Sequence, residues 1–526
     1  MSNRHRPLAS LRRAPPLTLL TALLLAACGP SPTITVQLGD ATVQVTLGSS
    51  ASTEVTLTRA GGASADVTLD ADGAPDWATV SFSPATLSGD TLTSTMTIET
   101  DGQDPDAAAT SFTLTVTAAG SGLSASDELT VEVTLLTVSG KVTGIYGETL
   151  TGYSVSVNGG TPVPVDSLGV FQGPDVPVPY DLVVIDTTNA VGHRYEGLTT
   201  TDLVLTEPSS SSSYTTGLTG DLSQAVGTEQ MGIVCMEGID RVVTGCDTVT
   251  PGNTAFAIAP EWFETSTVSA YVHAWVVDVD ADGATTGFAH EGRTAINLTD
   301  SVPAVADVAL EGGPPATTVD LTVTAPPGVP LVGSQLYYRY SEHGAVAFPS
   351  GPTSSSYTAV MPDVPGATAV LVAQASAGEV QAIGWEVGEY GSGAMALTMP
   401  PVVAAVAPPD GATGVDHSTQ FSVNNPSGSA VTFLFSQAGD ISFYLVTKDD
   451  TVTTIPDLSA LGLALPSGAD FTWQAVTTPH LPTVDDVTRE GWITGLVAVQ
   501  MLINGGPGPS ASGNVSVNST RTFKTE

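Results

Sequence analysis

The sequence predicts an all-β protein built of tandem β-sandwich domains. Apolar and polar residues alternate with a period of two, as in Thr33–Leu38 and Leu92–Ile98, which is typical of half-buried strands. The 54 glycines and 37 prolines recur between such runs and mark turns. Helical periodicity is almost absent, and only residues 457–463 are expected to form one or two turns of helix. A chain of 526 residues is too long for one core, so we expect several sandwiches in series.

The N-terminus has the pattern of an export signal. A stretch with four arginines precedes the apolar run Leu17–Leu25, and small residues follow at Ala26 and Ala27. The run is too short to span a bilayer as a helix. We therefore expect residues 1–27 to be a cleaved signal peptide and residues 28–32 to be the anchor that remains. The alternative is an ordinary signal peptide that happens to contain a cysteine.

The end of this signal carries a resemblance. The sequence Leu25-Ala26-Ala27-Cys28 is similar to the lipobox of bacterial lipoproteins, which are cleaved before the cysteine and acylated on it. The resemblance implies that acyl chains on Cys28 insert into a bacterial membrane, and two or more chains give stable attachment. Gly29, where some bacteria use aspartate for inner-membrane retention, favours the outer membrane or the cell surface.

Residues 33–136 form the first predicted domain, because they hold seven or eight strand-like runs, the content of one sandwich. Within it, Gly73–Pro84 and the following Thr86–Gly89 resemble bacterial immunoglobulin-like repeats. The resemblance implies an Ig-like sandwich in which Trp77 packs at the edge rather than serving as a ligand platform.

The second predicted domain covers residues 137–207. Its runs Val138–Gly144, Tyr153–Val157 and Tyr180–Ile185 resemble carboxypeptidase-regulatory-like domains, which are small transthyretin-like modules. The resemblance implies a binding or spacer module without catalysis. Residues 208–214 contain five consecutive serines and are expected to form a flexible linker.

A third predicted domain, residues 215–313, contains the two remaining cysteines. Cys235 and Cys246 lie in short β-like runs on either side of residues 238–241. An even pair in an exported chain predicts a disulfide across a hairpin, worth about 3 kcal/mol in the chain-entropy model. The alternative is two free buried thiols.

The same domain holds the sharpest candidate metal site. Asp278, Asp280 and Asp282 alternate and end at Gly283, which matches the start of a calcium loop. The pattern then fails, because the twelfth position is Ala289 and supplies no carboxylate. The favoured alternative is a plain hairpin turn on Asp282-Gly283. His273 and His290 flank the turn and could approach each other, although a transition-metal site would need a third ligand.

Two further domains are predicted at residues 314–400 and 401–526. The segment Pro408–Val415 resembles the entry of bacterial Ig-like or fibronectin-type domains. Phe471–Val476 is expected to be a core strand of the last domain, with Trp473 buried.

Charge and motifs restrict the function. The chain has 53 acidic against 14 basic residues, a net charge of −39, which excludes nucleic acid as a partner because phosphate contacts need basic residues. It contains no Gly-x-Ser-x-Gly, no His-Glu-x-x-His and no phosphate-binding glycine loop. We therefore expect a non-catalytic, membrane-anchored surface lipoprotein that acts in adhesion, in binding a protein or glycan, or as a spacer. No cofactor is expected, apart from the possible calcium.

The alternative is a lipid-anchored glycan-binding protein or hydrolase whose carboxylates come from distant parts of the chain. The nearby acidic pairs are Asp485 with Asp486, and Glu261 with Glu264. The second pair encloses Trp262 and Phe263, as a carbohydrate-stacking loop would, although an ordinary strand edge is favoured.

Overall fold

The computed structural model describes residues 31–526 except 102–110, 146–147, 208–212, 350–353, 379, 390–392, 438–439, 449–451, 492–493 and 507. These residues are mostly strand, which confirms the all-β fold and the tandem sandwiches. The predicted signal peptide, Cys28 and most of the serine linker lie outside the described residues. The chain forms two compact units, one ending at Leu136 and also including Val176–Val178, the other formed by Thr137–Asp175 and Pro179–Glu526.

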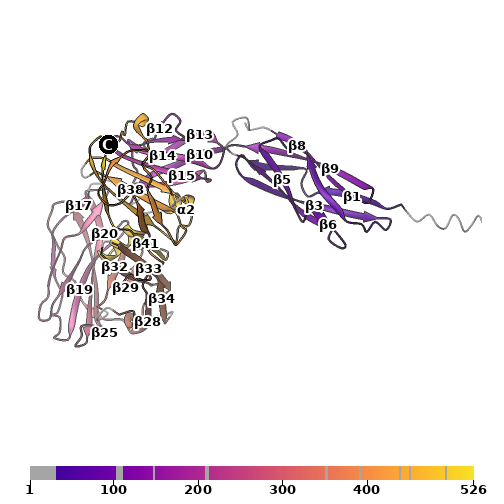
Figure 1. Ribbon diagram of the computed structural model, residues 1–526. Helices are drawn as coiled ribbons and strands as arrows, with labels where there is room; N and C mark the ends of the chain where they lie inside the picture. Colours follow the sequence, from indigo (N-terminus) through magenta and orange to yellow (C-terminus); the bar gives the residue numbers. More distant parts are fainter. Residues whose placement is uncertain are drawn as a thin grey trace, which may run out of the picture. The chain divides into compact units, whose positions relative to one another are not determined.

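The first unit is a β-sandwich of two sheets (Figure 1). Its strands alternate buried and exposed positions, so each sheet places one apolar face in a shared core, as in β1 with Ile34, Val36 and Leu38 inside. Trp77 packs edge-on against Phe112 with ring centroids 5.6 Å apart, which confirms its packing role. In sheet order the strands are β1 (Thr33–Leu38), β3 (Ser50–Ala60), β7 (Thr93–Thr100) and β5 (Ala78–Ser83), then β2 (Thr42–Thr46), β9 (Leu123–Thr134), β8 (Ser111–Gly120), β4 (Val67–Asp72) and β6 (Thr86–Leu87).

The second unit begins with a small pair of sheets. Three strands form the order β13-β10-β16, in which β10 and β16 are parallel. Four others lie antiparallel in the order β12-β11-β14-β15 and continue into a much larger sheet. The strands are β10 (Leu136–Gly144), β11 (Ser154–Val157), β12 (Val163–Pro164), β13 (Val170–Val176), β14 (Tyr180–Asp186), β15 (Val191–Leu198) and β16 (Asp202–Glu207).

The cysteine-bearing part of this unit centres on a five-stranded sheet in the order β21-β19-β24-β25-β27, with two three-stranded sheets, β17-β23-β20 and β22-β18-β26. The strands are β17 (Ser213–Thr215), β18 (Leu218–Asp221), β19 (Gln230–Gly238), β20 (Val243–Thr244), β21 (Cys246–Val249), β22 (Ala255–Ile258), β23 (Glu261–Phe263), β24 (Thr267–Val279), β25 (Thr285–Thr299), β26 (Ala304–Val305) and β27 (Glu311–Gly312). Even-numbered residues of β24 enter one apolar core and odd-numbered residues another, so both faces of this strand are covered.

A fourteen-stranded sheet crosses the described part of the second unit, in the main order β12-β11-β14-β15-β39-β38-β40-β41-β33-β32-β29-β30, with β36 and β42 attached at its side. It is continuous because β15 pairs in parallel with β39, and β33 pairs with β41. Strands from the predicted ranges 137–207, 314–400 and 401–526 therefore share one sheet, and the finer domain boundaries stay a prediction. The strands not yet given are β29 (Leu331–Ser341), β30 (Gly344–Ala347), β32 (Thr368–Ala377), β33 (Val380–Glu389), β36 (Ala412–Val415), β38 (Val431–Ser436), β39 (Ser442–Thr447), β40 (Asp470–Thr477), β41 (Gly513–Val517) and β42 (Arg521–Thr525).

Smaller sheets and cores complete the unit. Trp473 is fully buried, as predicted, and its ring packs against Phe421 and against Phe433 of β38. The remaining strands pair as β31-β28-β34 and β35-β37; they are β28 (Ala316–Thr324), β31 (Ser356–Pro362), β34 (Ala394–Thr398), β35 (Ala404–Ala407) and β37 (Ser422–Asn424).

The helices depart from the sequence-based expectation. The predicted turn of helix exists as a 3-10 helix at Ser459–Leu461, but α2 (Val484–Glu490) and α3 (Thr494–Ile503) were not predicted. Helix α2 is stabilised by a capping box between Thr483 and Asp486. Helix α3 is apolar over most of its circumference, so it shows no amphipathic period. Among the described residues, no helix has the length and apolar character needed to cross a bilayer.

Candidate functional site

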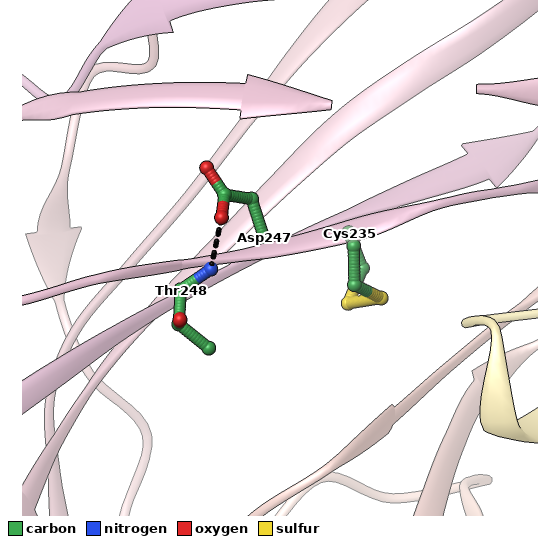
Figure 2. Close-up of a disulfide and its surroundings, with 4 residues drawn as sticks. Cys235, Asp247 and Thr248 are labelled. Atoms are coloured by element: carbon green, nitrogen blue, oxygen red, sulfur yellow. Dashed lines mark hydrogen bonds between the residues drawn. A yellow bond between two sulfur atoms is a disulfide. The ribbon is translucent and has the colours of Figure 1, made fainter. Parts of the chain in front are cut away.

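The disulfide is present and joins two neighbouring antiparallel strands (Figure 2). Cys235 of β19 lies directly opposite Cys246 of β21, which confirms the predicted pairing. Beside it, the Asp247 carboxylate accepts the backbone N–H groups of Thr248 at 2.8 Å and Ala257 at 2.7 Å. Asp247 therefore satisfies an amide that the sheet edge at β21 would otherwise leave unpaired.

The loop after α3 closes over the disulfide. Gly245 donates its N–H to the Asn504 carbonyl at 2.7 Å, and Ala345 donates to the Gly505 carbonyl at 3.1 Å. Gly505 has φ +87°, and a Cβ atom there would lie 2.7 Å from the Cys246 sulfur. Only glycine fits both the backbone conformation and the space. The loop thereby connects the disulfide hairpin to β30.

A hollow of about 400 Å³ opens beside this contact. Its walls come from β19 and β21 with the disulfide, from β29 and β30, and from the end of α3. The lining is mainly apolar, and Asp247 is the charged residue among its described members. A concave apolar surface with a few polar groups is the usual form of a binding site.

A charged cluster lies on the same face of this sheet. Arg293 donates to Glu237 at 2.7 Å, and His273 Nε2 lies 2.8 Å from a Glu291 oxygen. His273 Nδ1 is 3.8 Å from the second Glu237 oxygen. The register explains the convergence, because Glu237 is opposite Tyr271 and His273 is opposite Arg293, so that period-two alternation keeps their side chains on one face.

Aromatic rings enclose this cluster. His273 stacks on Trp275 at 4.7 Å and meets the edge of Tyr340 at 4.6 Å, while the Arg293 guanidinium lies 3.6 Å above the Tyr271 ring. Burial, and next the Glu237 charge, raise the pKa of Tyr340. Two carboxylates meet one guanidinium and one imidazole here, so this arrangement can hold three strands together through charge-assisted hydrogen bonds.

A second buried pair lies elsewhere in the unit. His193 of β15 and Glu207 of β16 are each 1% exposed, with Nε2 and Oε2 2.5 Å apart. The Tyr444 ring stacks on His193 at 4.2 Å, and the Tyr195 hydroxyl donates to Glu207 at 3.4 Å. Burial, and next the Glu207 charge, raise the pKa of Tyr195 well above its usual range. Neither this pair nor Glu237 and Arg293 was predicted from the sequence.

The acidic turn forms the hairpin between β24 and β25. Asp280 Oδ1 accepts the N–H groups of Asp282 at 2.9 Å and Ala284 at 2.8 Å, and Gly283 takes φ +81°. Asp278 accepts from Gln230 at 2.9 Å. Within the described ranges, no group of three or more His, Cys, Asp or Glu side chains is arranged to hold a metal ion. The turn is present, and calcium binding stays a prediction.

Thermal melting of the full chain with and without about 5 mM calcium tests that prediction, since a ligand that binds only the folded state stabilises it. Asp280→Asn keeps the turn acceptor but removes a charge, so a calcium-dependent rise in melting temperature should shrink in this variant. If calcium leaves the melting temperature of the unmutated chain unchanged, the prediction of calcium binding is wrong.

The two histidines near this turn do not form a site. His273 is opposite Arg293, whereas His290 is opposite Val276, three positions further along β24. Positions an odd number of residues apart point to opposite faces of a strand, and His290 instead contacts the Glu311 carbonyl at 3.0 Å. The suggested approach of the two imidazoles is therefore wrong.

The acidic pairs have structural contacts. Asp485 accepts the Thr199 N–H at 2.9 Å, and Asp486 belongs to the α2 capping box. Trp262, between Glu261 and Glu264, is fully buried and donates its indole N–H to Thr265 at 2.8 Å. Trp262 is therefore not an exposed stacking platform, and its segment is the strand β23.

Comparisons with known proteins give remote structural likenesses. No family model and no curated protein sequence matches the chain. The Bacillus anthracis TIE protein is 11% identical, with a TM-score of 0.22 over 70% of this chain and 74% of that one. The pilus adhesin SpaC of Lactobacillus rhamnosus GG is 10% identical, with a TM-score of 0.16 over 66% of this chain and 57% of that one. Domains 4–9 of the surface layer protein SbsC are 12% identical, with a TM-score of 0.16 over 85% and 80%.

Proposed function

We propose that the chain is a bacterial envelope lipoprotein that is held to a membrane by acyl chains on Cys28 and acts without catalysis in adhesion, binding or spacing. The sequence Leu25-Ala26-Ala27-Cys28 after a short apolar run is the observation that carries the proposal. The second unit, which the anchor would hold at the membrane, supports this role. Its fourteen-stranded sheet includes both β11, which begins at Ser154, and β42, which ends at Thr525. Such a continuous sheet suits a rigid module that presents a surface away from the membrane.

Cys28→Ser should abolish acylation and release the protein from the membrane. Cells expressing each form would be labelled with an alkyne analogue of palmitate and then fractionated. We expect label and membrane association for the unmutated chain, and neither for Cys28→Ser, because the acyl chains supply the apolar area that partitions into lipid. Gly29→Asp is the matched control, since it should keep the label whichever membrane it reaches. Equal membrane association of Cys28→Ser and the unmutated chain would contradict the proposal.

A glycan-binding or hydrolytic role is the second candidate. The observation that favours it is a hollow of about 330 Å³ lined by Glu291, Arg293 and Glu311, in which the two glutamates are directly opposite each other on β25 and β27. Hydrolysis of chromogenic glycosides that disappears in Glu291→Gln would favour this role over the non-catalytic one.

A further inference from the structure

The strand β30 is an outer edge of the fourteen-stranded sheet and pairs only with β29 among the described strands. Alternate residues of an edge strand direct their N–H and C=O groups away from the sheet. Ala345 does so, because its N–H donates to the Gly505 carbonyl, and Pro349 does so, because its carbonyl accepts from Thr285 at 2.8 Å.

Ala347 lies between these two positions. The same alternation directs its N–H and C=O away from β29, and none of the described residues hydrogen-bonds to them. Ala347 lines the 400 Å³ hollow beside the disulfide, together with Val346 and Phe348. The hollow therefore contains an open stretch of sheet edge, bounded at one end by the loop at Gly505 and at the other by β25.

The dimensions of this stretch fit a short extended peptide. Pro349 is four positions after Ala345, which corresponds to about 14 Å at the rise of an antiparallel strand. The hydrogen bond from the Ala345 N–H to the Gly505 carbonyl is of the kind that an added strand makes. A guest strand would continue this pairing at Ala347. An unpaired donor and acceptor on one residue are satisfied together by another extended backbone.

The side chains around the stretch define the chemistry of the guest. Ile503 at the end of α3 is 50% exposed and lines the hollow, as do Met231 and Ile233 of β19. These favour apolar guest side chains. The nearby Asp247 and the net charge of −39 favour basic residues on either side of the apolar segment.

We propose that this hollow binds an extended apolar segment of a partner polypeptide, flanked by basic residues, by strand addition to β30. The proposal deepens the binding role proposed above and rests on it. Its test is independent of the anchor, because binding is measured on the full chain in detergent, whether or not Cys28 is acylated.

The probe is a fluorescein-labelled pentapeptide, Lys-Val-Thr-Val-Lys, whose three central residues span about 10 Å and therefore fit the stretch. Its binding is measured by fluorescence anisotropy. We expect saturable binding with a Kd below about 1 mM. A twin peptide with its three central amides N-methylated cannot donate these backbone hydrogen bonds and should bind at least about tenfold more weakly. Hydrogen exchange should show new protection at the Ala347 amide.

Two variants locate the binding. Ala347→Pro removes the outward N–H without breaking a hydrogen bond to β29. Ile503→Lys places a positive charge at the mouth of the hollow, where it repels the basic peptide. Each variant should weaken binding about tenfold or more. Val332→Lys is the matched control, because Val332 is 56% exposed on β29 and does not line the hollow. The proposal is overturned by the absence of saturable binding, by equal binding of the methylated peptide, or by unchanged affinity in both hollow variants.

Discussion

Replacing Glu207 with leucine should lower the free energy of unfolding by about 3–5 kcal/mol, because it leaves His193 buried without its carboxylate. Both partners are 1% exposed, so water cannot replace the lost contact. Urea unfolding of the full chain, followed by tryptophan fluorescence, measures the change.

Two further variants separate the effect of burial from the effect of charge on the cost of Glu207→Leu. Asp181→Ala removes a carboxylate that lies 2.9 Å from Arg194 in the same region but is 38% exposed, so the cost should stay below about 1 kcal/mol. The double change His193→Phe with Glu207→Leu should cost less than Glu207→Leu alone, because it leaves no orphaned polar partner. A cost of Glu207→Leu no larger than that of Asp181→Ala would contradict this interpretation.

Replacing Gly505 with alanine should cost about 3 kcal/mol, from a left-handed backbone and from a Cβ placed 2.7 Å from the Cys246 sulfur. Gly252→Ala is the control, because Gly252 has φ +83° and a Cβ atom added there would meet nothing within 4 Å, so only the backbone cost of about 1–2 kcal/mol remains. The comparison uses the same urea unfolding experiment. Equal losses for the two variants would show that the contact between the α3 loop and the disulfide contributes little.

The strands and the disulfide could be predicted from the sequence because their signals are local. Apolar and polar residues alternate in runs such as Thr33–Leu38 because one face of the strand packs in the core and the other meets water. Cys235 and Cys246 could be paired because they are close in the chain and no other cysteine follows Cys28. The buried position of Trp473 could be predicted from its place in a strand-like segment, and the edge packing of Trp77 from the resemblance to immunoglobulin-like repeats.

The continuous sheet could not be predicted, because β15 and β39 are far apart in the chain and no local pattern identifies which edges meet. Helix α3 was missed because its apolar residues surround the axis, so its segment resembles a buried strand. Its neighbour α2 did carry a signal, since Thr483 and Asp486 have the spacing of a capping box.

The sequence contains only a partial signal of the charged cluster around Glu237. Glu237 is a single charge in the otherwise apolar run Met231–Gly238, which indicates a buried carboxylate that needs a partner. Its partner Arg293 is 56 residues away, and only the pairing of β19, β24 and β25 brings the two together. The open edge at Ala347 left no sequence signal, because it depends on where the α3 loop ends.

The most direct test of the proposed anchoring is the mass of the N-terminal peptide of the protein purified from bacterial membranes. Lipid anchoring predicts a chain that begins at Cys28 and carries on it the added mass of two or more acyl chains. A mature chain with an unmodified Cys28, or one that begins elsewhere, would contradict the proposed anchoring and with it the proposal that the protein is a lipoprotein.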